Sequence, residues 1–148
     1  NRDARQAMLL GSMLAGMAFA NAPVAAVHAL AYPVGARFHV PHGLSNALVL
    51  PAVLRFNMTA AETLYAELAG IVVPEAGGSE AARAAALVDQ LGRLGGELGL
   101  PVRLAEVGIT AADVPALAED AMKQTRLLIN NPREVTLADA TRLYGEAL

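Results

Sequence analysis

Residues 7–36 read AMLLGSMLAGMAFANAPVAAVHALAYPVGA, and this uncharged, alanine-rich stretch indicates the fold class of the chain. Within it, small residues recur at every fourth position in two series: Ala7, Gly11 and Ala15, and Ser12, Gly16 and Ala20. Ridges of small side chains allow two helices to pack closely. Over the whole chain Ala occurs 32 times and Leu 22 times, against 16 for Val and Ile together. Because Ala and Leu favour helices while β-branched residues favour strands, this balance predicts an all-α fold.

The composition describes one ordered domain. The chain has 148 residues, with 17% charged residues and a mean hydropathy of +0.40, which excludes a disordered tail. A net charge of -3 with only 11 basic residues does not indicate a basic surface that would bind nucleic acid. The absence of Cys excludes disulfides and thiolate metal sites. No repeat, low-complexity tract or linker divides the chain, so residues 1–148 are expected to form a single helical unit.

The stretch without charge extends from Arg5 to Arg37, which exceeds the roughly 20 residues that a membrane span needs. Asn21, Pro23 and Pro33 divide it into shorter apolar runs, and such runs are typical of buried core helices. We therefore expect no membrane partner and interpret the stretch as a buried wall of core helices. A non-catalytic helical binding or membrane module is an alternative that this run alone supports.

Capping residues, prolines and glycines predict about seven helical elements. The expected helices cover residues 2–20, a segment from Pro23 to about Ala31 that ends at Tyr32–Gly35, a segment from Pro41 with a kink at Pro51, a segment from Thr59 to Gly70, a segment from Ser79 to about Leu98, a segment from Thr110 to about Leu128, and a last helix from Thr136.

All three histidines lie between residues 28 and 42, and their chemistry leaves two interpretations open. Neutral imidazole is a common metal ligand, and a turn between two helices can bring His28 and His42 together. A catalytic metal needs about three protein ligands, however, and no carboxylate occurs between Asp3 and Glu62. In the alternative interpretation His28 is a buried, hydrogen-bonded side chain, while His39 and His42 are loop residues.

The sequence around the histidines resembles the iron-containing alcohol dehydrogenase family, within the dehydroquinate synthase-like superfamily. The segments that carry the resemblance are GMAFANA at 16–22, AVHALAYPVG at 26–35, PHGLSNA at 41–47, LP at 50–51, LRFN at 54–57 and NPREVT at 131–136. They follow the order and spacing of the family and span essentially the whole chain.

The resemblance implies a two-domain enzyme in which an N-terminal α/β domain binds NAD or NADP and the C-terminal domain is helical. A metal, usually Fe²⁺ and in the glycerol dehydrogenase branch Zn²⁺, lies in the cleft between the domains. His28 and His42 correspond to two metal ligands of the family, and Phe19 to an aromatic residue that lines the substrate pocket. Tyr32 stands where the family often has a histidine suited to proton relay, which makes Tyr32 the candidate catalytic residue. The alternative is that Tyr32 only packs at a helix end.

The implied reaction is reversible hydride transfer between a small alcohol or aldehyde and NAD(P), with the metal as a Lewis acid. The family's other two metal ligands, an Asp and a His four residues later, belong upstream of Asn1, and the chain contains no Gly-rich phosphate loop. We therefore expect the C-terminal part of a cytoplasmic, homodimeric enzyme that is inactive without its N-terminal NAD(P)-binding domain. A glycerol dehydrogenase-like enzyme or another member of the superfamily is the alternative.

Overall fold

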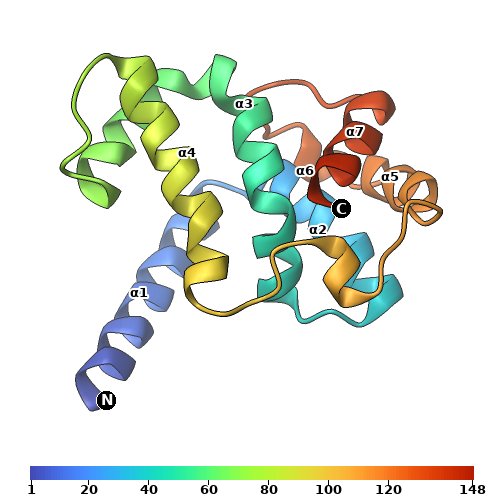
Figure 1. Cartoon of the computed structure of the whole chain (residues 1–148), viewed down its shortest axis with the longest axis horizontal. Helices are drawn as coiled ribbons and strands as arrows, with labels where there is room; N and C mark the ends of the chain where they lie inside the picture. Colours follow the sequence, from blue (N-terminus) through green and yellow to red (C-terminus); the bar gives the residue numbers. More distant parts are fainter.

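The computed structural model describes all residues 1–148 and contains helices but no strand (Figure 1). The elements are α1 (Arg2–Asn21), α2 (Ala26–Phe38), α3 (His42–Val72), α4 (Glu80–Glu97), the 3-10 helix η1 (Leu104–Val107), α5 (Val114–Met122), α6 (Thr125–Leu128) and α7 (Leu137–Ala147). The expected all-α fold is thus confirmed.

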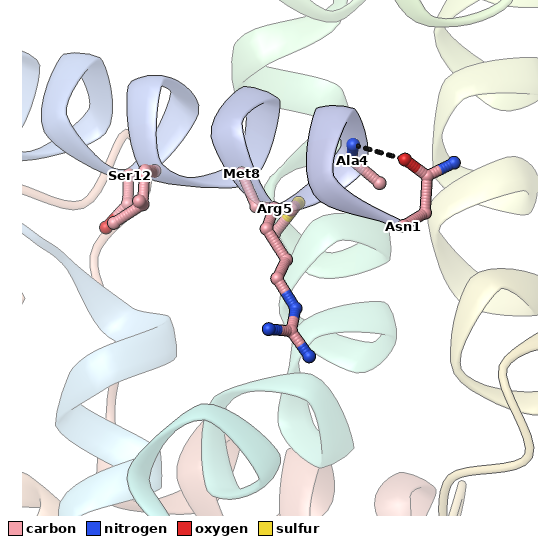
Figure 2. Close-up of a pocket in the computed structure, with 6 residues that line it drawn as sticks. Asn1, Ala4, Arg5, Met8 and Ser12 are labelled. Carbon is pink, nitrogen blue, oxygen red and sulfur yellow. Dashed lines mark hydrogen bonds between the residues drawn. The ribbon is translucent and has the colours of Figure 1, made fainter.

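Helix α1 projects from the rest of the domain and buries none of its residues (Figure 1). It is capped by Asn1, whose Oδ1 accepts a hydrogen bond from the backbone N–H of Asp3 at 2.9 Å. The same oxygen accepts a second bond from the Ala4 N–H at 3.2 Å (Figure 2). A hollow of about 610 Å³ along its first turns is lined only by Asn1 and residues of α1, and Arg5 extends from the helix without an ion pair (Figure 2). Seven large apolar side chains of α1 are more than half exposed, namely Met8, Leu9, Leu10, Met13, Leu14, Met17 and Phe19. Within these 148 residues, the expectation of a buried wall is therefore wrong for α1.

A sharp bend separates α1 from α2. The chain bends by 111° between the two helices. Neither helix alone is long and apolar enough to span a membrane, although the bent pair together satisfies that criterion. We expected the second helix at Pro23–Ala31, but Pro23 lies in the linker and the helix continues through Pro33 to Phe38. Pro33 removes only one backbone donor, and the buried stripe of Ala26, Leu30 and Val34 holds the helix against the core.

Helix α3 is the central element and packs against α2, α4 and α7. Two helices were expected here, with a kink at Pro51 and a new capped start at Thr59. The structure instead has one helical stretch of 31 residues, whose only non-helical residue is Ala61 at φ -126° and ψ 16°. The predicted break thus exists two residues beyond Thr59, and the capping box is not formed because α3 continues through Thr59.

The C-terminal half agrees better with the capping signals. Ser79 caps α4 by accepting a hydrogen bond from the Ala82 N–H at 3.2 Å, and Gly99 follows the helix at φ +69°. Thr136 and Asp139 form the predicted capping box of α7. The expected helix from Thr110 is displaced, because residues 110–113 form a turn and α5 and α6 are separated at residues 123–124.

One cluster of 22 buried residues, contributed mainly by α2, α3, α5 and α7, forms the core. Tyr144 of α7 is fully buried, and its hydroxyl donates a 2.6 Å hydrogen bond to the Leu30 carbonyl of α2. Burial raises the pKa of this phenol far above its ordinary value, so the hydroxyl stays a donor. This contact fixes α7 to α2, two residues beyond His28.

Candidate metal site

His28 and His42 both lie in the first turns of helices. His28 is the third residue of α2, and His42 is the first residue of α3. The capping positions before them, Ala25 and Pro41, make no side-chain hydrogen bond to the helix. Both side chains therefore lie near the partial positive charge that the N-terminal end of a helix carries. The sequence placed His42 correctly, whereas it placed His28 deeper within a helix than the structure does.

Three rings converge where the two helices begin. The ring centres of His28 and His42 are 5.3 Å apart, and that of Tyr32 lies 6.1 Å from His28 and 5.9 Å from His42. His39 is not part of this group, because it occupies the left-handed position after α2 at φ 56° and is exposed. The structure thus brings together His28, His42 and Tyr32 and leaves His39 in the loop that was expected for it.

A cavity of about 530 Å³ opens in front of the three rings. It is lined by Ser12, Ala15, Gly16, Phe19, Val24, His28, Tyr32 and His42. The predicted pocket residue Phe19 reaches this cavity from α1, with its side chain 58% exposed. A methyl group added at Gly16 would contact no other residue, so this small-residue face of α1 has no partner within the chain.

Electrostatics at the site favour neutral imidazole. Burial lowers the pKa of His28, and the neighbouring His42 lowers it further by charge repulsion. Neutral imidazole is the form that ligates a metal. The pair therefore presents His28 as a ready ligand at neutral pH.

The residues present fit part of a metal site. No group of three His, Asp or Glu side chains converges anywhere in the structure, so the chain offers two candidate imidazole ligands where a catalytic metal needs three or more. Beside them, Asn46 Nδ2 lies 3.1 Å from His42 Nε2 and donates a 2.9 Å bond to the His42 carbonyl. Asn46 Oδ1 is the one buried side-chain polar atom without a hydrogen-bond partner. The two convergent imidazoles of His28 and His42, together with the unpaired Asn46 Oδ1, form a polar site that is incomplete within this chain.

The sequence interpretation missed the asparagines around the site. Asn46 follows His42 by four residues, a spacing that places both on one helix face and could have identified it. Asn57 and Asn131 line a second cavity of about 570 Å³, which shares His28 and Val24 with the first. Their contact joins residues 74 positions apart, and no local pattern predicts it.

The chain is similar to known proteins over its whole length. The model of the Fe-containing alcohol dehydrogenase family, C-terminal, matches residues 1–148. Lactaldehyde reductase of Escherichia coli K12 is 38% identical over 149 residues, which cover 99% of this chain and 38% of that protein. The NAD-dependent methanol dehydrogenase of Bacillus methanolicus is 31% identical over 147 residues, with the same two coverages.

A solved structure of 1,3-propanediol oxidoreductase superposes on all of this chain with a TM-score of 0.95 and 34% identity, and the match covers 39% of that protein. The chain therefore spans less than two fifths of the length of the relatives it matches. Helical architecture, family model and sequence identity agree over the whole of residues 1–148, and the chain belongs to the iron-containing alcohol dehydrogenase family, where it corresponds to the C-terminal helical region.

Proposed function

We propose that this chain acts as the C-terminal part of a metal-dependent dehydrogenase that interconverts small alcohols and aldehydes with NAD or NADP. The observation that carries the proposal is the 5.3 Å approach of the His28 and His42 rings at the mouth of a cavity. The named relatives act on lactaldehyde, methanol and 1,3-propanediol, which supports a small oxygenated substrate.

In the proposed site, His28 and His42 hold one divalent metal, Fe²⁺ by family membership and Zn²⁺ as the alternative. When bound, the metal supplies Lewis acidity toward the substrate oxygen, and the nicotinamide supplies the hydride chemistry. The lowered pKa of His28 keeps that ring available as a ligand, because a proton does not compete for its lone pair at neutral pH. The remaining metal ligands and the nicotinamide site are assigned to the part of the enzyme that this chain does not contain.

Tyr32 and Phe19 are assigned the roles that their positions allow. The Tyr32 ring faces both histidines, so its hydroxyl can donate a hydrogen bond to a substrate oxygen held between them. A phenolic hydroxyl donates a hydrogen bond but relays protons less readily than an imidazole, so we assign Tyr32 the role of a hydrogen-bond donor to the substrate. Phe19 covers the cavity from α1 and excludes water from the reacting atoms.

We further propose that the rest of the enzyme covers α1. Its seven exposed apolar side chains form a surface that monomeric proteins rarely leave open to water. An N-terminal domain seated on α1 would also enclose the cavity at the histidines, because Ser12, Ala15, Gly16 and Phe19 of α1 form one of its walls. By the family resemblance we propose a cytoplasmic homodimer, which light scattering and cell fractionation of the complete protein test.

The function is tested by assaying the complete protein with a series of small alcohols and aldehydes, NAD and NADP, after loading with Fe²⁺ or Zn²⁺. The proposal predicts reversible turnover that requires metal, and it predicts that residues 1–148 alone neither bind NAD nor turn over an alcohol. Turnover that survives complete metal removal contradicts the metal assignment. A clear NAD titration of the isolated 148-residue chain contradicts the division of roles between the two parts.

A further inference from the structure

Side-chain hydrogen bonds hold the turn that contains Asn130, Asn131 and Arg133 against α3. The Asn57 and Asn131 side chains form a reciprocal amide pair, with Nδ2 to Oδ1 distances of 2.9 and 2.8 Å. Asn57 is only 5% exposed, so both bonds form largely away from water. Next to them, the Arg133 guanidinium donates to the Phe56 carbonyl at 3.2 Å and stacks 4.1 Å from the centre of the Phe56 ring. Two consecutive residues of α3 therefore fix this turn.

The same turn reaches the linker in front of His28. Asn130 Nδ2 donates a 3.1 Å hydrogen bond to the Val24 carbonyl and a 2.9 Å bond to the Arg126 carbonyl, which anchors Asn130 at the end of α6. No other hydrogen bond joins residues 22–25 to a segment outside α1 and α2. Because α2 begins without a side-chain cap, the Asn130 bond is the only polar contact that fixes this linker to the core.

The linker position determines two walls of the candidate site. Val24 lines the cavity itself and precedes His28 by four residues. On its other side the linker sets the 111° angle of α1, which carries Phe19. A shift of Val24 therefore moves the His28 ring relative to His42, and it also moves the Phe19 wall. His42 begins α3, the same helix on which the Asn57–Asn131 pair is anchored.

We propose that Asn130 is a positioning residue of the metal site, held in place by the Asn57–Asn131 pair, which sets the linker and hence the spacing of His28 and His42. The inference rests on the proposed function, since it assigns Asn130 a role only if the two histidines hold a metal. Asn130 contacts neither ring and acts through the Val24 carbonyl.

The test uses the complete protein loaded with Co²⁺, whose visible absorption reports the geometry of its ligands. Asn130→Ala removes the amide, and Asn130→Asp keeps its shape but removes the donor. Asn130 is exposed, so neither variant leaves a cavity in the core. Thr136→Ala is the matched control, because it removes a polar cap on α7 without touching the linker. Chelator competition measures Co²⁺ affinity, and thermal melting of the metal-free protein measures stability.

Both Asn130 variants are expected to weaken Co²⁺ binding about tenfold, the lower end of the range for residues that support metal ligands, and to shift the Co²⁺ spectrum. Thr136→Ala is expected to lower the melting temperature while leaving affinity and spectrum unchanged. Wild-type protein that binds Co²⁺ together with Asn130 variants of unchanged affinity and spectrum would overturn the inference and leave the proposed function intact. Wild-type protein that binds no Co²⁺ would overturn both.

Discussion

Replacing Leu10 of α1 by Asp tests whether α1 stays open to water in the complete protein or is covered by the rest of the enzyme. In the 148-residue chain Leu10 is 54% exposed, so the substitution removes little buried area and costs about 0.5 kcal/mol of helix propensity. If a domain covers α1, the missing half of the Leu10 burial contributes about 1 kcal/mol, and an unpaired buried carboxylate costs a further ~3 kcal/mol. The expected loss of unfolding free energy is thus about 4.5 kcal/mol in the complete protein and about 0.5 kcal/mol in the chain alone.

Urea denaturation of both proteins, each with and without the substitution, measures this contrast. Leu10→Met is the control, because it keeps the volume and apolar character and costs less than ~1.5 kcal/mol even in a packed site. Amide hydrogen exchange adds an independent readout: peptides of α1 are expected to exchange quickly in the isolated chain and slowly in the complete protein. Equal, small effects of Leu10→Asp in both proteins, with unprotected α1 amides in the complete protein, would refute the proposal that α1 is covered.

Three further substitutions test separate parts of the account. Tyr144→Phe removes the hydrogen bond to the Leu30 carbonyl but keeps the ring, so urea denaturation is expected to show a loss of about 1 kcal/mol. The hydrogen bond from the Thr136 hydroxyl holds the pKa of Asp139 below its usual range. The ionised Asp139 therefore contributes fully to the free energy of unfolding above the ordinary pKa of an aspartate, and this contribution disappears as the pH falls through the lowered pKa of the folded state. Asp139→Asn is therefore expected to cost ~0.5 kcal/mol at neutral pH and nothing at strongly acid pH, as pH-dependent melting would show, whereas a loss independent of pH argues against it. Tyr32→Phe is expected to lower kcat of the complete enzyme about tenfold through one lost hydrogen bond to substrate, and an unchanged kcat assigns Tyr32 to packing alone.

Local signals predicted those parts of the fold that local chemistry determines. The caps at Ser79 and at Thr136 with Asp139 are correct, because side chain and backbone donor lie within three residues of each other. Proline was misleading at Pro33, where the helix was expected to end, and at Pro51, where a kink was expected, because buried apolar faces keep the backbone helical across one lost hydrogen bond. At these two prolines tertiary packing outweighs a local preference. The expected start of α2 is wrong for another reason, since Pro23 lies in the linker, and the expected new start at Thr59 is wrong because α3 continues through that residue.

For the site, sequence alone identified His28 and His42 and could not supply their geometry. Their approach to 5.3 Å follows from how α2 and α3 pack, which spacing along the chain leaves open. The asparagine contacts at residues 57 and 131 are long-range and were not predicted. The charge-free stretch before Arg37 was interpreted as buried, and within residues 1–148 its first helix is exposed, which is the observation behind the proposal that the rest of the enzyme covers α1.

The metal content of the complete protein, compared among wild type, His28→Ala and His42→Ala, tests the central claim most directly. We predict one tightly bound divalent metal per wild-type chain, iron in the native protein, and loss of both metal and dehydrogenase activity in each variant with the fold retained in circular dichroism. Metal content and activity equal to wild type in both variants would contradict the assignment of these histidines as metal ligands.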